Sequence, residues 1–489
     1  MATDESRSFF DTTPLGRIVN RFSKDVDVMD NQLTDAIRVY FMTIAITASV
    51  FILIIVYFNY FAVALFPLAI LFTTSVAYYR ASAREVKRHE SVLRSHVFAK
   101  FGESLSGAAS IRAYGLESRF SETINKAIDE MNGAYFITFS NQRWLTTRLD
   151  VIGNLLVFTT CILVVTSRFS VNPSIAGVVL SYILQIVMIL QWMIRQLAEV
   201  ENAMNATERM HYYGTELPEE AALRTNAQIP PTWPEHGAIE FRNVSMRYRP
   251  GLPLVLRNLS LTIPGGSRVG IVGRTGAGKS SITATLFRLT ELVSGSILID
   301  GVDIAGIGLE TLRGKLSIIP QEPTLFKGTV RTNLDPFQQH SDETLLSALR
   351  ESYLDSAATL DTAVEEEGYN FSLGQRQQIA LARALVRGSR IVVADEATSS
   401  VDVETDKVIQ RSMKEGFRGR TLLCIAHRLQ TVMGYDLVVV MDAGEVVEMG
   451  EPGELWRRRG AWFGMCERSG ITERDFEKRR ADDRVEEKA

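Results

Sequence analysis

The sequence predicts a chain of two unlike halves, an all-α half of membrane-spanning helices followed by a compact α/β half. Two observations carry this prediction. No charged residue occurs between Arg38 and Arg80, a gap of 41 positions, and a second apolar region covers residues 151–194. Beyond residue 237, by contrast, short apolar runs end at glycine-rich or polar residues, as the strands of an open parallel sheet do.

The apolar regions are long enough for four membrane crossings. A helix over the 41 uncharged positions would be roughly 60 Å long, which is two crossings of a ~30 Å hydrocarbon core. The second region is interrupted near its middle by one charge, Arg168. We therefore expect membrane helices at about 37–57, 60–79, 150–167 and 174–194. A buried soluble helical hairpin is the alternative, and the length and purity of the runs disfavour it.

The loops indicate the orientation of these helices. Residues 80–142 carry nine Lys or Arg residues, whereas the turns near Asn59 and at 166–173 are short. The positive-inside rule therefore assigns 1–36, 80–142 and everything after 195 to the cytosol. Because residues 80–142 also have a helical pattern, the helices should continue beyond the bilayer.

Composition excludes several other classes. The chain opens polar and acidic, so no secretory signal is visible. Cys161, Cys424 and Cys466 have neither disulfide nor zinc spacing. The net charge is −4, and we expect no nucleic-acid partner.

Proline and glycine indicate the domain boundaries. Four prolines stand among polar residues between Gly214 and Gly237, which is typical of a linker. We expect a membrane domain at 1–213, a linker at 214–236, a compact α/β domain at 237–469 and a charged tail at 470–489.

The run from Gly273 to Ser280 is typical of a phosphate-binding (Walker A) loop, because it stands between a strand-like and a helical segment. Its glycines let backbone N–H groups surround phosphate oxygens at a helix N-terminus. Lys279 should reach the β- and γ-phosphates as a binding and catalytic residue, and Ser280 should hold Mg²⁺. The expected nucleotide-binding residues of this run are Gly273, Thr275, Gly276, Ala277, Gly278, Lys279, Ser280 and Ser281.

An acidic pair follows another apolar run, at Asp395 and Glu396. Asp395 is expected in the Mg²⁺ shell. Glu396, one step further along the extended chain, is expected to polarise the attacking water. Alone, such a pair is more often a helix N-cap on the surface, and the spacing to the other elements favours the catalytic interpretation.

Gln321 and His427 also come directly after apolar, strand-like runs. With Gly273 and Asp395 they should therefore meet at the carboxyl edge of one parallel sheet, where ligands bind. We expect Gln321 in the metal shell with a catalytic role, and His427 at the γ-phosphate. Tyr248, before the first expected strand, is predicted to stack on the adenine, with simple packing as the alternative.

The order of these elements resembles that of ATP-binding cassette (ABC) transporters throughout 237–469. The run Phe371-Ser372-Leu373-Gly374-Gln375 is similar to the family signature LSGGQ, and Ser399-Ser400-Val401-Asp402 follows it. In the family, the signature faces ATP that is held by an opposing nucleotide-binding domain. The resemblance thus implies a shared interface with Ser372, Gly374, Gln375 and Asp402. Ser372 is also suited to cap the helix that follows it.

Upstream, residues 9–22 and 101–114 resemble the cytosolic coupling loops of multidrug-resistance-associated (C-subfamily) exporters. Asn370–Gln375 and Ser469–Thr472 are most similar to the fungal oligomycin-resistance type. The resemblance implies part of a type I exporter membrane domain, followed by an ABC ATPase domain with a helical signature subdomain. Its partners would be an opposing nucleotide-binding domain and transmembrane half, in the same longer chain or in another.

Two departures from the family pattern matter. Leu373 stands where the signature has its middle glycine, which should weaken this chain's contribution to the opposing site. The resemblance then implies a second cassette, which hydrolyses ATP at its own Lys279 and Glu396. The family has twelve core helices and two cassettes, so we expect a C-terminal fragment or a truncated gene model. Alone it should bind ATP and hydrolyse it poorly.

The function that the resemblance implies is ATP-driven efflux of amphipathic or anionic compounds, as in multidrug resistance. Trp192 and Arg195 are candidates for contact with substrate, although an interfacial tryptophan is the simpler interpretation of Trp192. Gln185, Gln191 and Asn154 would line the same cavity or bond neighbouring helices.

An ATP-gated channel, a regulatory subunit and an inactive fragment stay open as alternatives. A soluble ABC ATPase is disfavoured by the four spans, and a homodimer by its eight helices. We expect a multi-pass protein of the plasma membrane rather than the vacuole, with ATP and Mg²⁺ bound in the cytosol.

Overall fold

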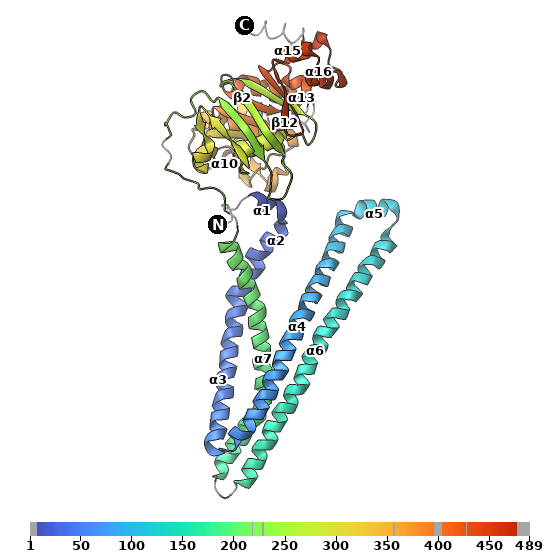
Figure 1. Cartoon of the computed structure of the whole chain (residues 1–489), viewed down its shortest axis with the longest axis vertical. Helices are drawn as coiled ribbons and strands as arrows, with labels where there is room; N and C mark the ends of the chain where they lie inside the picture. The colour runs from blue at the N-terminus through green and yellow to red at the C-terminus, as the bar shows by residue number, and fades with distance from the viewer. Residues whose placement is uncertain are drawn as a thin grey trace. The chain divides into compact units, whose positions relative to one another are not determined.

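The chain forms two compact units in a computed structural model that describes residues 7–167, 169, 171–217, 219–226, 229–355, 357–395, 403–426 and 428–476. The first, the helical unit, is Pro14–Leu217. The second, the sheet unit, is Pro218–Ala489 together with Met1–Thr13. Both are drawn in Figure 1.

The helical unit is built from four long helices. Each is apolar and long enough to cross a membrane by length and composition, and the described residues hold four such segments, the same number that the sequence predicts. Two of them, α4 and α6, pack along each other and are joined by the short helix α5, while α3 packs along α7 (Figure 1). The bounds are α3 Thr34–Tyr57, α4 Phe61–Ser106, α5 Ala108–Tyr114, α6 Glu117–Thr166 and α7 Pro173–Thr215.

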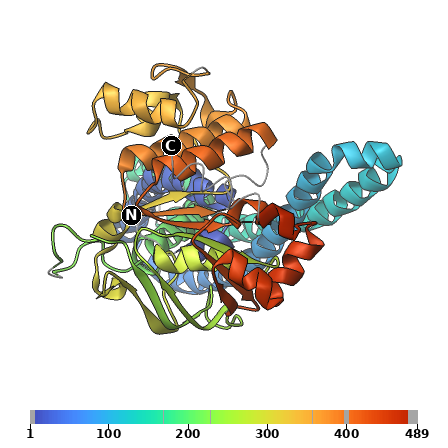
Figure 2. The same ribbon diagram turned by 90° about the horizontal axis from the view of Figure 1, so that it is seen from above.

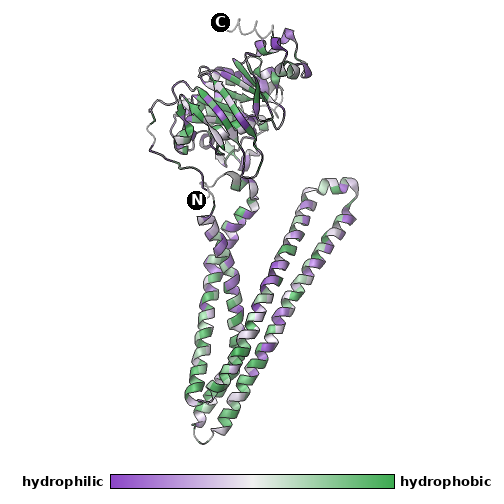
Figure 3. Ribbon diagram, in the orientation of Figure 1, coloured by the Kyte–Doolittle hydropathy of each residue, from purple (hydrophilic) through white to green (hydrophobic). Residues whose placement is uncertain are grey.

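Apolar residues gather near the α3–α4 and α6–α7 turns, and polar residues toward α2 and α5 (Figure 3). In the apolar part, Ile54, Phe61 and Ile183 are fully buried between the helices. Phe66 and Leu184, by contrast, are 71% and 64% exposed. Outward-facing apolar side chains are what a lipid-exposed surface requires, since lipid cannot satisfy polar groups.

The two segments expected as coupling loops are largely helical. The first contains α1 (Arg7–Thr12), α2 (Leu15–Asn20) and part of η1 (Arg21–Asp25), a π-helical turn that a second one, η2 (Val28–Leu33), follows before α3. Of these, α1 belongs to the sheet unit. The expected membrane domain at 1–213 therefore includes a helix that the structure assigns to the other unit. The second segment contains the end of α4 and all of α5.

In its described residues the sheet unit contains two larger sheets and one short two-stranded sheet, formed by β7 and β8. The four-stranded antiparallel sheet has the order β2-β1-β4-β5, and the six-stranded sheet has the order β12-β11-β3-β10-β9-β6 with only β12 antiparallel. The strands are β1 Ile239–Met246, β2 Leu256–Ile263, β3 Arg268–Gly273, β4 Ser294–Ile299, β5 Val302–Asp303, β6 Leu316–Ile319, β7 Gly328–Thr329, β8 Ala363–Val364, β9 Ile391–Asp395, β10 Thr421–Ile425, β11 Leu437–Asp442 and β12 Glu445–Gly450. The helices are α8 Lys279–Leu286, α9 Leu309–Lys315, α10 Val330–Leu334, α11 Asp342–Glu351, α12 Leu373–Arg387, α13 Val403–Gly416, α14 Leu429–Val432, α15 Pro452–Arg458 and α16 Ala461–Arg468, with short 3₁₀ turns at Ile304–Gly306 and Glu366–Gly368.

Two hydrophobic cores lie on opposite faces of the six-stranded sheet. One joins it to α8 and the antiparallel sheet, and the other joins it to α12, α13 and α16. In Figure 2 the green antiparallel strands and the orange helices accordingly lie on opposite sides of the unit. A third core lies between α12 and the small helices α10 and α11. Thus α12 is buried on two faces. Leu381 faces the sheet, and Ile379 faces α10 and α11, which we call the helical subdomain.

The expected linker at 214–236 differs from the structure at both ends. The helix α7 continues to Thr215. Glu220 accepts a hydrogen bond of 2.7 Å from Arg313 of α9, and the indole N–H of the buried Trp233 donates to the Ile299 carbonyl at 2.9 Å. Most of the segment is therefore part of the sheet unit, which begins at Pro218, and a buried tryptophan anchors it there.

The compact unit also continues past residue 469, where the sequence analysis expected a charged tail. Ile471 and Phe476 are buried in the core behind the six-stranded sheet. The ring of Phe476 lies 4.9 Å from that of Trp456. The residues up to 476 are therefore part of the fold, because apolar side chains among the charges pack into the core.

Candidate nucleotide-binding site

The turn between β3 and α8 holds the predicted phosphate-binding loop. Lys279, the first residue of α8, is buried, and its ammonium group donates to the carbonyls of Gly273 and Arg274 at 2.9 and 3.1 Å. These bonds hold the lysine across its own loop, so its charge lies at the helix N-terminus. A loop of this kind, with a positive charge and a helix dipole at one end, is suited to bind phosphate.

Glycines in this loop are required by geometry. Gly278 is the N-cap of α8 and has φ of +94°, and a Cβ there would lie 3.2 Å from the Val255 carbonyl oxygen. A Cβ on Gly273 would lie 2.3 Å from the Met441 carbonyl oxygen. Side chains at either position would displace the backbone. The outer part of the loop, at Thr275 and Gly276, is exposed, as a phosphate site requires.

Ser280 and Asp395 meet at the carboxyl edge of the sheet. The hydroxyl of Ser280 donates to Asp395 Oδ1 at 3.2 Å. Asp395 ends β9 and Ser280 lies in α8, which follows β3, and β10 lies between these two strands. The hydroxyl is exposed, so water and ions reach it. Two of the three residues that the sequence assigned to Mg²⁺ are thus brought together by the sheet order.

Gln321 lies two residues beyond β6, next along the same edge. Its side chain is exposed, while its backbone carbonyl accepts a bond of 2.7 Å from Gln377 Nε2 on α12. Gln377 is 2% exposed. Sequence reasoning missed this residue, because nothing in its spacing shows that it bonds to a backbone atom of another element.

The hydroxyls of Tyr248 and Ser281 are hydrogen-bonded to each other, and the position of Tyr248 corrects one expectation. Tyr248 follows β1 instead of preceding the first strand, and its hydroxyl lies 2.8 Å from Ser281 Oγ. Tyr248 is half-buried against the first core, and Ser281 is buried. The hydroxyl of Ser281 is therefore directed at the tyrosine, which fits the packing alternative for Tyr248.

The signature-like run begins α12 as expected for a helix cap. Ser372 Oγ accepts from the backbone N–H of Gln375 at 3.2 Å, and Gln375 Oε1 accepts from the backbone N–H of Ser372 at 2.9 Å. This reciprocal capping box fixes the start of the helix at Leu373. The Gln375 side chain is used within the cap, and Gly374 lies half-exposed in the first turn.

A second missed residue, Arg383, fastens α12 to the helical subdomain. It donates to the Asn333 carbonyl at 2.7 Å and to the Thr324 carbonyl at 2.8 Å. Burial holds the pKa of its guanidinium below the usual range. The segment that follows Gln321 is thus attached to the signature helix by Arg383 as well as by Gln377.

Three predicted site residues, Glu396, Asp402 and His427, lie outside the described residues. The strands that lead to two of them are described. Asp395 and Ile425 are paired in register at the ends of β9 and β10. The chain therefore arrives at Glu396 and at His427 from neighbouring strands of one edge.

The described residues fit a nucleotide with Mg²⁺. The loop offers backbone N–H groups and the charge of Lys279, while Ser280 and Asp395 would supply two oxygen ligands. Within the described ranges no three His, Cys, Asp or Glu side chains form a metal-binding group. Mg²⁺ is usually held by one or two protein oxygens together with phosphates and water.

The candidate substrate residues separate into two groups. Gln191 donates to Asp150 of α6, so it bonds a neighbouring helix, the second of its two expected roles. Gln185, Trp192 and Arg195 are exposed and share one face of α7 by their spacing. Asn154 of α6 is also exposed.

A polytopic helical unit followed by this sheet unit defines a membrane ATPase with a phosphate-binding loop. Comparison with known families agrees with this class. Residues 4–190 match the ABC transporter transmembrane region, and residues 256–399 match the ABC transporter family model. The chain belongs to the ABC transporters, with a helical transmembrane domain followed by an ABC ATPase domain.

Relatives place it near the C subfamily. It is 61% identical to the ABC-type transporter cicA of Emericella nidulans over 491 residues, 96% of this chain and 35% of that protein. It is 46% identical to the Oligomycin resistance ATP-dependent permease YOR1 of Saccharomyces cerevisiae, over 96% of this chain and 34% of that protein. It is 43% identical to ATP-binding cassette sub-family C member 3 of Rattus norvegicus, over 95% of this chain and 31% of that protein. The chain spans about a third of the length of these relatives.

A solved structure has the same fold. The bacterial Atm1-family ABC exporter with ATP bound has a TM-score of 0.82 at 25% identity, over 96% of this chain and 83% of that one. The predicted fold class and family are confirmed by these comparisons.

Proposed function

We propose that this chain is the ATP-hydrolysing part of an exporter that moves amphipathic or anionic organic compounds across a membrane. One observation carries the proposal: Ser280, Asp395 and the loop of Lys279 meet at one sheet edge in a chain whose described residues include four helices long and apolar enough to cross a membrane. An ATP site joined to a polytopic membrane domain is suited to convert hydrolysis into transport.

The residues have distinct roles in this proposal. Lys279 and the loop amides would bind the triphosphate, and Ser280, Asp395 and Gln321 would hold Mg²⁺, which neutralises phosphate charge when bound. Glu396 would orient and polarise the attacking water, and His427 would contact the γ-phosphate. The exposed Gly276 would let backbone N–H groups approach the phosphates closely.

An opposing nucleotide-binding domain would complete the site. Ser372 and its capping box fix the amide end of α12, where a phosphate of the opposing nucleotide would bind. Leu373 would make this contact weaker than one with glycine, because its side chain occupies the first turn. The chain's own Lys279 and Glu396 would then form the more active of the two sites, with Asp402 at the same interface.

The substrate path would use the exposed face of α7 with Trp192 and Arg195. A tryptophan there suits an amphipathic ring, and an arginine suits an anionic group. The plasma membrane is the proposed location, with the ATPase domain in the cytosol.

The test is concentrative uptake into inverted membrane vesicles from cells that produce the chain together with an opposing transporter half. An amphipathic anionic dye should accumulate with ATP and Mg²⁺, and accumulation should be lost in Glu396→Gln. Glu122→Gln, which neutralises an exposed acid of α6, is the matched control and should retain uptake. A conductance that persists in Glu396→Gln, without concentrative uptake, would instead indicate a channel and refute the proposal.

A further inference from the structure

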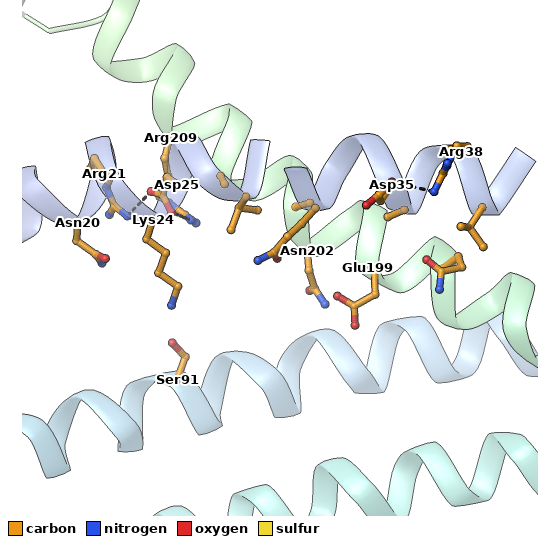
Figure 4. A pocket seen from close by; sticks show the side chains of 17 residues that line it. Asn20, Arg21, Lys24, Asp25, Asp35, Arg38, Ser91, Glu199, Asn202 and Arg209 are labelled. Atoms are coloured by element: carbon orange, nitrogen blue, oxygen red, sulfur yellow. Dashed lines mark hydrogen bonds and ion pairs between the residues drawn. The ribbon is translucent and has the colours of Figure 1, made fainter. Parts of the chain in front are cut away.

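A buried carboxylate joins the start of the helical unit to its end. Asp25 of η1 is 3% exposed. Arg209 of α7 donates to both of its oxygens, from Nε to Oδ2 at 2.9 Å and from Nη2 to Oδ1 at 2.7 Å. Arg21 Nη1 also donates to Oδ2, at 2.8 Å. We call Arg21, Asp25 and Arg209 the Asp25 cluster (Figure 4).

The cluster is a strong contact by the usual physical criteria. A guanidinium that bonds both oxygens of one carboxylate fixes orientation as well as distance. Removing one member of a buried ion pair leaves a charge without compensation, which is costly. Next to the cluster, the rings of Phe22 and Tyr213 pack edge to face at 6.3 Å. The contact therefore holds two segments 184 residues apart in sequence.

The position of the cluster in the chain gives it its significance. The helical unit begins at Pro14, shortly before Asp25, and ends at Leu217, shortly after Arg209. Both chain connections to the sheet unit therefore leave from the two segments that the cluster joins. Movement passed along either connection would reach both segments together while the ion pair is intact.

Local geometry supports a moving part on this side of the unit. Asp25 lies in the first of two π-helical turns, η1 and η2, and such turns often occur at functional sites. The cluster lines one end of a polar pocket of about 830 Å³ that also touches Ser91 of α4. Figure 4 shows Lys24 directed across this pocket toward Ser91. The pocket leaves room for α3 and α7 to move as a pair relative to α4.

We propose that Asp25 and Arg209 are positioning residues that couple the ATPase cycle to the membrane helices. The inference rests on the proposed exporter function. Neither residue belongs to the nucleotide site. Their ion pair makes the segment before α3 and the end of α7 move as one body, so that motion of the ATPase domain reaches both helices.

The first test measures dye transported per ATP hydrolysed in the vesicles described above. Asp25→Asn should lower this ratio at least fivefold and keep ATP hydrolysis within about twofold of the parent. The charge exchange Asp25→Arg with Arg209→Asp should recover at least half of the ratio, and Glu122→Gln should leave it unchanged. An unchanged ratio in Asp25→Asn would overturn the inference, and so would equal losses of transport and hydrolysis.

The second test does not depend on transport. In the assembled protein with its three cysteines replaced by serine, Phe22→Cys and Tyr213→Cys are joined by a short bifunctional thiol reagent. Cross-linking should be the same with and without ATP when Asp25 is present, and should fall at least threefold with ATP and Mg²⁺ in Asp25→Asn. Equal cross-linking in both backgrounds would refute the coupling pair. Parental vesicles without uptake would count against the exporter function alone.

Discussion

Ser280 Oγ lies 3.2 Å from Asp395 Oδ1, although 115 residues separate them in the sequence. The contact exists because β3 and β9 flank β10 in one parallel sheet and end at the same edge. A hydroxyl and a carboxylate at this distance would suit one hard cation as a pair of oxygen ligands.

Asp395→Asn should therefore raise the Mg²⁺ concentration needed for tight ATP binding by about tenfold or more, since a charged ligand is lost. Nucleotide binding without Mg²⁺ should change little, because the loop of Lys279 is intact. Titrating Mg²⁺ against a fluorescent ATP analogue measures both. Asp361→Asn, an 85% exposed carboxylate of the same unit, should match the parent. An Asp395→Asn protein with the parental Mg²⁺ dependence would contradict the assignment.

Gly278→Ala should destabilise the sheet unit by about 1–3 kcal/mol. Its φ of +94° is strained for alanine, and the new Cβ would lie 3.1 Å from Leu256 Cδ2. Gly314→Ala in α9 is the control, because that glycine has open space around it. It should be neutral or stabilising by up to about 1 kcal/mol. Pulse proteolysis of the solubilised protein in urea measures both, and equal stability of the two variants would refute the argument.

Protonation of Asp300 should make the sheet unit less stable in acid. Partial burial opposes its charge, but the backbone N–H groups of His236, Gly237 and Ala238 donate to it at 2.7–3.1 Å and hold the pKa of this carboxyl below its usual range. A lowered folded-state pKa stabilises the fold above the unfolded value, near 3.9, and this stabilisation is lost as the pH falls through the folded value.

Asp300→Asn should thus cost about 2 kcal/mol at pH 7, and the difference from the parent should shrink as the pH falls below about 4. Urea midpoints measured between pH 7 and pH 3 check this. A penalty that is constant over that range would show that the carboxylate charge is not responsible.

Cys424 and Cys466 should resist alkylation in the native protein. Burial raises the pKa of the Cys424 thiol to about 11 and that of the Cys466 thiol to about 12. Only the thiolate is a good nucleophile, and at pH 8 both groups are almost fully protonated as well as covered. Mass spectrometry after iodoacetamide treatment should find both unmodified until urea is added. Rapid native labelling of either thiol would contradict the described packing.

Much of the site could be predicted from local sequence. The glycine-rich loop, the strand before Asp395 and the cap at Ser372 each depend on a few consecutive residues, and the structure has all three as expected. The catalytic roles of Glu396 and His427 and the interface role of Asp402 stay predictions, because those residues lie outside the described ranges.

The errors share a different origin. Tyr248 bonds Ser281 across two elements, and Trp233 anchors a segment whose prolines indicated a linker. Gln377 bonds a backbone carbonyl 56 positions away. In each case the decisive partner is distant in the chain, so no spacing or periodicity in the sequence indicates it.

The sequence by itself determined the division into a membrane half and an ATPase half, the number of spans and the phosphate-binding loop. Those features depend on apolar run length and on short-range backbone geometry, which neighbouring residues control. Only the tertiary structure decided that Ser280 donates a hydrogen bond directly to Asp395 and that Asp25 meets Arg209. Such contacts depend on sheet order and helix packing, which arise from the burial of many side chains at once.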